Sequence, residues 1–295
     1  MQRLTFICFF IGLCFLTVNA QDISYGFRVG LNFSSVNGPE ASDASGASLE
    51  STKANTGFHV GGGPIFRLSD RFGVKAEVLF SQKGGEYSFE GNAIQLLTAN
   101  SGRRVRANGL RRMVVTVTNS YIDLPITGYA KLGEKFEVWG GANIAFLVGS
   151  NASGELGFDG VSAESNTPIA FTSALDYNYF QDEVPTLESL IENTEAVTFD
   201  ADGETITVPD VLGSYFEFEE KDGNFYNTLD VGLIAGASFY LNRGLFVSFA
   251  VNYGLVDATN EAYDVSRTEV NGLQYIQSND NDNNLSLQAS VGFSF

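Results

Sequence analysis

The residues that most often carry enzyme chemistry are scarce in this chain of 295 residues. His59 is its single histidine, and its two cysteines, Cys8 and Cys14, both lie within the first 20 residues. This count excludes a zinc site built from several histidines. A general base at His59 would need a serine and a carboxylate placed beside it by the fold. No motif nominates such partners, so we expect His59 to be a packing residue and the chain to be non-enzymatic, with no catalytic residue and no cofactor.

Two short acidic segments could ligate calcium through oxygen atoms. They are Asp200-Ala201-Asp202-Gly203-Glu204 and Asn279-Asp280-Asn281-Asp282-Asn283. Neither segment reproduces the ligand spacing of an EF-hand loop. Turns stabilised by Asn and Asp side chains are the commoner explanation for such runs, so we predict no metal site and leave calcium binding by these loops open.

Charge is distributed very unevenly along the chain. Residues 149–224 contain 17 Asp or Glu and a single base, Lys221, within a protein of net charge −18. Residues 88–113 show the opposite bias, with five arginines against Glu90: Arg103, Arg104, Arg106, Arg111 and Arg112. These arginines could bind the phosphates of an anionic partner, but we favour ion pairs with the acidic segment. No nucleic-acid partner is expected, because that requires a basic footprint on the protein.

Residues 1–20 have the pattern of a cleavable signal peptide. Arg3 supplies the positive start, Leu4–Val18 is an apolar run, and Val18-Asn19-Ala20 offers the short residues that a signal peptidase needs. The apolar run is shorter than the roughly 20 residues of a membrane-spanning helix. We therefore expect cleavage before Gln21. The mature domain of residues 21–295 would then contain no cysteine and no disulfide. Lipidation at Cys14 is an alternative, but Leu13, the residue before this cysteine, is a poor fit to the lipidation motif.

The remainder of the chain alternates between apolar and small or polar residues, which is the period of a β-strand. In the first segment Tyr25, Phe27 and Val29 share one face, and Gly26 and Arg28 share the other. The same alternation predicts eight strands, at residues 25–34, 56–68, 72–87, 114–131, 136–148, 225–241, 245–256 and 285–295. After the signal peptide no segment approaches 18 consecutive apolar residues, so no transmembrane helix is expected.

The connections between these strands alternate in length. Tight turns at residues 69–71, 133–134 and 242–244 alternate with long connections at 35–55, 88–113, 149–224 and 257–284. Short periplasmic turns and long extracellular loops are typical of outer-membrane barrels, and a sheet in lipid must close because it cannot leave an edge unpaired. We predict an all-β fold, an eight-stranded antiparallel up-and-down transmembrane β-barrel. Ten strands would result if the acidic loop added a hairpin to the wall.

The distribution of polar residues predicts which face of the sheet is inside. The polar face carries charges of both signs, at Arg28, His59, Arg67, Lys75, Glu77, Asp123, Glu137 and Asp230. An eight-stranded barrel has an interior just wide enough to be filled by side chains. We therefore expect lumen ion pairs such as Lys75 with Glu137 and Arg28 with Glu77, and an apolar face toward lipid. A secreted lipocalin-like barrel, with the two faces reversed, is the alternative.

The large acidic loop, residues 149–224, contains signals of internal order. Thr198–Val208 predicts a hairpin with Asp202-Gly203 at its turn. Pro185–Glu192 predicts a short helix with proline near its start. We expect a partly folded cap over the mouth of the barrel.

Several segments resemble a known family. Tyr121-Ile122-Asp123-Leu124-Pro125-Ile126 is similar to the Tyr-x-Glu/Asp-Ile/Leu-Pro pattern of the PorT-like outer-membrane β-barrel family of Bacteroidetes, and Tyr25–Asn32 looks like the first strand of that family. The final strand, which ends on Phe295, resembles the C-terminal signal that the barrel-assembly machinery recognises. The resemblance implies residence in the outer membrane of a Gram-negative cell. It supplies no catalytic residue.

Three functions follow as hypotheses. The first is a barrel with a surface binding, assembly or envelope-structural role, whose partners would be outer-membrane lipid, lipopolysaccharide, the barrel-assembly machinery and a surface protein that meets the acidic loop. The second is a narrow porin-like channel for small solutes, which a filled eight-stranded lumen disfavours. The third is an outer-membrane enzyme that depends on His59.

Overall fold

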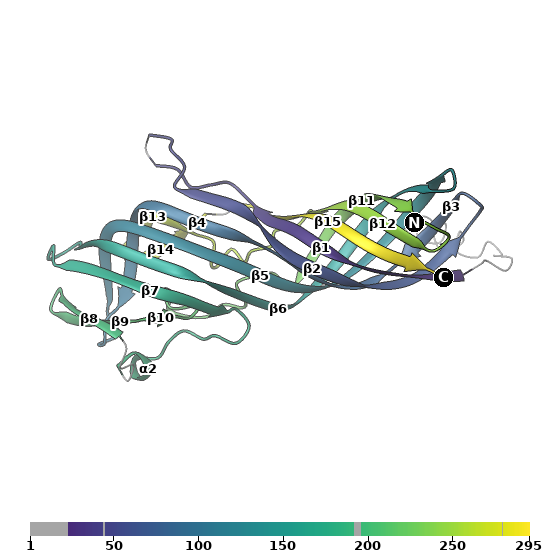
Figure 1. Cartoon of the computed structure of the whole chain (residues 1–295). Coiled ribbons are helices and arrows are strands. Elements are labelled where there is room, and N and C mark those ends of the chain that lie inside the picture. Colours follow the sequence, from purple (N-terminus) through teal and green to yellow (C-terminus); the bar gives the residue numbers. More distant parts are fainter. Residues whose placement is uncertain (1–22, 44, 192–195, 279) are drawn as a thin grey trace, which may run out of the picture.

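The computed structural model describes residues 23–43, 45–191, 196–278 and 280–295, and it is built almost entirely of antiparallel strands (Figure 1). The predicted signal peptide, residues 1–20, lies outside the described residues. Both ends of the described chain lie at the end of the molecule that carries the short turns (Figure 1). Among the described residues no helix is long and apolar enough to cross a membrane.

The main sheet forms a ring whose wall has eight positions. Its strands are β1 (Ile23–Asn37), β2 (Glu50–Arg67), β3 (Phe72–Ala76), β4 (Val78–Thr98), β5 (Arg104–Leu132), β6 (Phe136–Ser162), β11 (Leu229–Tyr240), β12 (Leu245–Gly254) and β15 (Asn283–Ser294). β6 pairs with both β5 and β11, and β15 returns to β1 in a register that places Phe27 opposite Phe293. All eight predicted strands are present, with β3 and β4 as two parts of one predicted strand.

The break between β3 and β4 falls at Glu77 and has a local cause. By register, Pro125 on β5 lies opposite Glu77, and Pro64 on β2 lies opposite the preceding residue, Ala76. Proline has no N–H to donate to a neighbouring strand. The Glu77 N–H still donates to the Pro125 carbonyl oxygen at 3.1 Å, so the wall stays connected while the strand geometry is interrupted.

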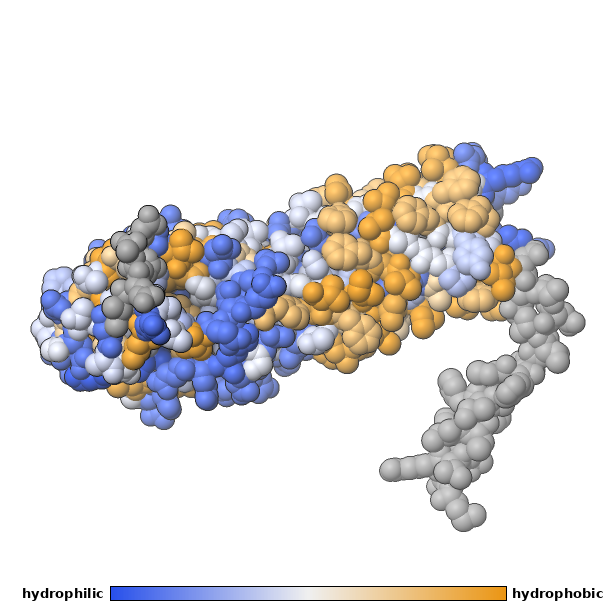
Figure 2. All heavy atoms as spheres, turned by 90° about the horizontal axis from the view of Figure 1, so that it is seen from below, coloured by the Kyte–Doolittle hydropathy of each residue, from blue (hydrophilic) through white to orange (hydrophobic). Residues whose placement is uncertain are grey.

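The apolar and polar faces lie as predicted. Phe27 is 49% exposed on the outside of the ring, whereas Arg28, the next residue, is 3% exposed inside it. Figure 2 shows hydrophobic side chains over the half of the molecule that carries the short turns, and mostly hydrophilic side chains over the other half. An apolar exterior around a polar interior is the arrangement that lipid requires and contradicts the lipocalin-like alternative.

Three strands continue well beyond the predicted boundaries. The pairing of β4 with β5 runs without interruption from Leu79 opposite Asp123 to Thr98 opposite Arg104, and β6 continues to Ser162. The prediction of a long connection at residues 88–113 was therefore wrong, because only residues 99–103 separate the two strands. Outside lipid the outer face of a strand can be polar, so the arginines of this region do not interrupt the sheet.

The remaining elements belong to the half with the long loops. They are β7 (Pro168–Asn178), α2 (Leu187–Ile191), β8 (Ala196–Ala201), β9 (Glu204–Pro209), β10 (Val211–Leu212), β13 (Val265–Asn271) and β14 (Gln274–Gln277). The predicted hairpin is present as β8 and β9, with Asp202 and Gly203 at positive φ (59° and 78°) in its turn. The predicted helix is present as α2; its expected last residue, Glu192, lies outside the described residues. β8 and β9 form a sheet of their own, so they add no strand to the ring.

The extensions of β4, β5 and β6, with β7 beside β6, form a curved sheet that we call the extension sheet. β10 pairs in parallel with β7 at the edge of this sheet. One face of the sheet packs against β9 and the segment from Gly213 to Tyr226. We call β8, β9, β10 and this segment the cap. The shared core consists of buried apolar residues from both layers, including Val105, Leu156, Phe171, Ile206 and Leu212. The predicted cap is therefore present, as a second hydrophobic core stacked on the barrel.

Candidate functional site

The centre of the lumen is occupied by a buried charge cluster. The Nζ atom of Lys83 lies 3.0 Å from Oδ1 of Asp123 and 3.8 Å from Oδ2 of Asp230. Asn284 donates to Asp230 at 3.1 Å, and the ammonium of Lys83 lies 4.7 Å from the centre of the Tyr121 ring. Asp123 and Asp230 were predicted lumen residues. Lys83 was not singled out, although its parity with Lys75 along the strand places it on the same face.

His59 lies in a second polar cluster inside the barrel. Its Nδ1 atom is 2.7 Å from Oδ1 of Asn32, and its Nε2 atom is 2.7 Å from Oγ of Ser290. This order of hydroxyl, imidazole and amide resembles a nucleophile, a base and an orienting group. A substrate has no room there, however, because His59 is completely buried and a single methyl group placed on Gly30 would overlap its ring. The arrangement fits the predicted packing role.

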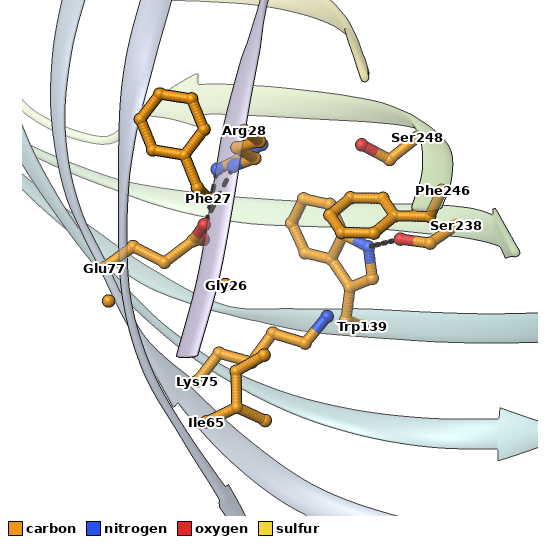
Figure 3. A pocket seen from close by; sticks show the side chains of 11 residues that line it. Gly26, Phe27, Arg28, Ile65, Lys75, Glu77, Trp139, Ser238, Phe246 and Ser248 are labelled. Atoms are coloured by element: carbon orange, nitrogen blue, oxygen red, sulfur yellow. Dashed lines mark hydrogen bonds and ion pairs between the residues drawn. The ribbon is translucent and has the colours of Figure 1, made fainter. Parts of the chain in front are cut away.

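Both predicted lumen ion pairs are present. Arg28 forms a bidentate pair with Glu77, at 3.0 Å from Nε to Oε1 and 3.2 Å from Nη2 to Oε2. Lys75 pairs with Glu137. Figure 3 shows Arg28 and Glu77 joined beside Trp139, whose indole N–H donates to Ser238 at 3.0 Å. The cavity between these side chains is about 20 Å³, which is room for about one water molecule.

A third buried charge cluster joins the cap to the extension sheet. Glu217 of the cap pairs with Arg111 on β5 and, at 2.9 Å, with Arg267 on β13. Gln95 on β4 donates to the same carboxylate at 2.6 Å. Burial by itself would raise the pKa of Glu217, but the guanidinium groups of Arg111 and Arg267 outweigh burial and hold this pKa well below its usual range. One carboxylate therefore connects three strands to the cap.

The prediction that the arginines of residues 88–113 pair with the acidic segment is confirmed for three of them. Arg103 lies 3.1 Å from Glu164, Arg104 lies 3.3 Å from Glu219, and Arg111 pairs with Glu217. The other two have neighbours within their own hairpin, since Arg112 pairs with Glu90 and Arg106 donates to Asn108. Arg267 was missed because nothing in its local sequence distinguishes it from an exposed strand residue.

The two candidate calcium segments form turn contacts. Asp202 accepts hydrogen bonds from the Ser162 hydroxyl at 2.6 Å and from the backbone N–H of Ser165 at 3.0 Å. Asp282 accepts from Thr259 at 3.1 Å, and Asn279 lies outside the described residues. Within the described parts of the chain, no group of three or more His, Cys, Asp or Glu side chains could hold a metal ion.

A family model for the outer membrane protein beta-barrel domain matches residues 19–260. The chain belongs to this family. Its ring of strands with an apolar exterior is the fold expected of an outer membrane β-barrel protein, and the protein is located in the outer membrane. The match is to the outer membrane protein beta-barrel domain as a whole, and not to the narrower PorT-like group.

Solved structures of outer-membrane proteins resemble this chain only distantly. Ail, the attachment invasion locus protein of Yersinia pestis, is 8% identical, with a TM-score of 0.34 and coverage of 92% of this chain and 98% of Ail. OprG from Pseudomonas aeruginosa is 10% identical, with a TM-score of 0.34 and coverage of 94% and 98%. The protease OmpT from Escherichia coli is 11% identical, with a TM-score of 0.23 and coverage of 95% and 99%. None of the curated proteins matches the chain. These likenesses carry no functional argument.

Proposed function

We propose that this outer membrane β-barrel protein is a closed, non-enzymatic barrel that anchors a folded structure on the cell surface, with a binding, assembly or envelope-structural role. The observation that carries the proposal is the filled lumen. Lys83, Asp123 and Tyr121 are buried across its centre, and the Arg28–Glu77 and Lys75–Glu137 pairs fill it toward the short-turn end. A lumen filled by side chains held in ion pairs favours structural anchoring over conduction.

The proposal includes an orientation in the membrane. Bacterial barrels place short turns in the periplasm and long loops outside the cell. The extension sheet and the cap are then extracellular, and the short-turn end is periplasmic. Removal of residues 1–20 by signal peptidase, delivery by the barrel-assembly machinery and membership of the PorT-like group belong to the same proposal. Sequencing the N-terminus of protein from outer membranes tests the cleavage before Gln21.

The surface offered to a partner is acidic. Glu155 and Asp159 on β6 and Asp176 on β7 are exposed, and they share the outer face of the extension sheet. Carboxylates on one exposed face attract cationic groups, and salt screens this attraction. We propose that the face binds a basic segment of a surface partner.

Single-channel recording in planar lipid bilayers tests the closed lumen. We expect the full chain to give no steady conductance. Reproducible channel steps would overturn the closed lumen and support the narrow porin-like alternative.

Binding of a polylysine probe to the protein in nanodiscs tests the acidic face. We expect a variant with Glu155→Gln, Asp159→Asn and Asp176→Asn to bind the probe more weakly than the native chain. The control removes the same charge elsewhere in the long-loop half, through Glu40→Gln, Glu261→Gln and Glu269→Gln, and should bind almost normally. Equal losses in the two variants would show that net charge alone attracts the probe and would contradict a specific face.

A further inference from the structure

One carboxylate inside the barrel has no cation of its own among the described residues. Arg28 and Lys75 are each paired with a glutamate. Lys83 alone faces two aspartates, Asp123 and Asp230. Its ammonium donates to Asp123 at 3.0 Å but lies 3.8 Å from Asp230, beyond hydrogen-bond distance. The centre of the lumen therefore holds two carboxylates against one cation, a surplus of one negative charge.

Two other residues of the lumen face do not balance this charge. His59 makes its two hydrogen bonds with a side-chain amide oxygen and a hydroxyl, which a neutral imidazole satisfies as one donor and one acceptor. Arg67 is exposed at the short-turn end, and the register places it six residues along the wall from the row of Asp123, roughly 20 Å away. The surplus charge is therefore local to Asp230.

Two buried oxygen atoms at this position have no hydrogen-bond donor in the described chain. They are Oδ1 of Asp230 and Oδ1 of Asn284, in residues that are 5% and 4% exposed. The Asn284 amide donates to the other oxygen of Asp230 at 3.1 Å, so the two side chains are in contact and their free oxygens belong to one site. An ionised carboxylate and an amide oxygen only accept, so neither can satisfy the other.

The neighbouring residue on β12 is a glycine. A methyl group added to Gly254 would lie 3.0 Å from Oδ1 of Asp230 and 3.4 Å from Cβ of Asn284. Any larger residue at position 254 would therefore crowd the free oxygen of Asp230. Glycine leaves that oxygen open to a small ligand.

We propose that the lumen binds one monovalent cation of the sodium class at Asp230, with the amide oxygen of Asn284 as a second ligand. Buried charges in proteins are paired or coordinate a metal ion, and carboxylate and carbonyl oxygens are the atoms that hold hard cations. A single positive charge cancels the surplus, whereas a divalent ion would reverse it. The described residues also offer no group of three or more acidic, His or Cys side chains for a divalent ion.

This ion is a structural one and goes beyond the proposed surface role. The filled lumen holds it in place, so the site stabilises the closed barrel and is not a step in transport. The proposal does not depend on whether the acidic outer face binds a partner.

The first experiment measures urea unfolding of the full chain in a nonionic detergent, with sodium chloride exchanged for choline chloride at constant ionic strength. A ligand that binds only the folded state stabilises it by mass action, so above saturation a tenfold rise in sodium should lower the unfolding equilibrium constant about tenfold. Asp230→Asn removes the surplus charge and keeps the Lys83–Asp123 pair, so we expect it to fold and to lose this response. The matched control, Asp70→Asn, removes an exposed carboxylate from a short turn and should respond like the native chain.

The second experiment counts the ion. Protein folded in sodium chloride is passed by gel filtration into choline chloride, and the retained sodium is measured by elemental mass spectrometry. We expect about one ion per chain in the native protein and in Asp70→Asn, and none in Asp230→Asn, because one charge is in surplus. The native chain alone decides this count, so the test holds even if Asp230→Asn does not fold.

Two results would overturn the proposal. One is a native chain that retains no sodium and whose stability is indifferent to sodium. The other is a stability that is indifferent to sodium but falls as the pH rises from 5 to 9, with the fall absent in Asp230→Asn. That second result would show that a proton, and not a metal cation, neutralises the carboxylate.

Discussion

The ammonium of Lys83 lies 3.0 Å from the carboxylate of Asp123, and their side chains are 1% and 2% exposed. Both charges sit inside the barrel and away from bulk water, with Asp230 close by. Such a pair contributes little net stability compared with apolar packing, but the loss of one partner leaves an uncompensated buried charge.

Lys83→Met should therefore destabilise the barrel strongly. It leaves Asp123 and Asp230 without their cation, and breaking a buried pair of this kind costs about 3–5 kcal/mol. The fluorescence of Trp139, the single tryptophan, reports barrel unfolding in urea. Lys53→Met is the control, because its pair with Glu86 is 69% exposed at the lysine and should change the free energy of unfolding by about 1 kcal/mol or less. A similar effect of both variants would contradict the importance of the central cluster.

Glu217→Gln should release the cap while leaving the barrel folded. The substitution leaves Arg111 and Arg267 buried without a counter-charge, which costs about 3–5 kcal/mol in cap stability. Limited proteolysis of the folded protein should then cut within residues 196–228 faster than in the native chain. Glu90→Gln is the matched control, because its pair with Arg112 is exposed. An unchanged cleavage rate in Glu217→Gln would show that apolar packing alone holds the cap.

The connection between β12 and β15 should become more stable as the pH falls from 7 to 5. Burial and the nearby carboxylates raise the pKa of Asp282 from 3.8 to about 6, and burial with Asp264 raises that of Asp280 to about 7. Because the folded state binds these protons more tightly than the unfolded state, stability rises as pH falls through that window. Hydrogen exchange of residues 257–278, corrected for the intrinsic rate at each pH, measures the effect. Asp282→Asn should remove much of this dependence, and a retained dependence would assign it to other groups.

A fall in pH should have the opposite effect on the cap, because protonation of Glu217 destabilises it. Its pKa is lowered in the folded state, so its contribution is fully present above the usual carboxyl value of 4.5 and is lost as pH falls through the lower folded value. The cap should thus remain closed at pH 5. Proteolysis by an acid-active protease at pH 5 and pH 3 measures this, and release of the cap already at pH 5 would contradict the assignment.

An arginine introduced at an exposed leucine should destabilise the protein in the lipid-facing half and have little effect in the half outside the membrane. Leu233 on β11 is 56% exposed, and Leu273, in the turn between β13 and β14, is 40% exposed. Leu233→Arg should cost up to about 2–4 kcal/mol in a bilayer, depending on its depth, because an arginine would face hydrocarbon. Leu273→Arg should be nearly neutral. Urea unfolding of both variants in lipid vesicles gives the two changes in the free energy of unfolding. Equal changes would contradict the assignment of the short-turn half to the membrane.

The sequence by itself determined which residues face lipid and which face the lumen. Successive residues such as Phe27 and Arg28 must point to opposite sides of a strand, and only an apolar exterior is stable in a membrane. Alternation therefore predicted the eight strands, the inverted faces and the Arg28–Glu77 and Lys75–Glu137 pairs. The alternation of apolar and polar residues is a poorer guide outside the membrane, because the outer face of a strand there can be polar. The arginines of β5 therefore led to the prediction of a connection where the structure has a regular strand.

Only the tertiary structure decided the contacts between distant segments. Closure of the ring brings Asp230 to Lys83 and Ser290 to His59, and folding of the cap brings Glu217 between Arg111 and Arg267. Each of these contacts depends on strand register and on the path of a loop, which set the distance between residues far apart in the chain. The cavity at the short-turn end, lined by Lys75, Lys131, Glu137 and Arg243 among others, has the same origin. Its lining residues come from separate strand ends and turns, and only the closed ring places them around one space.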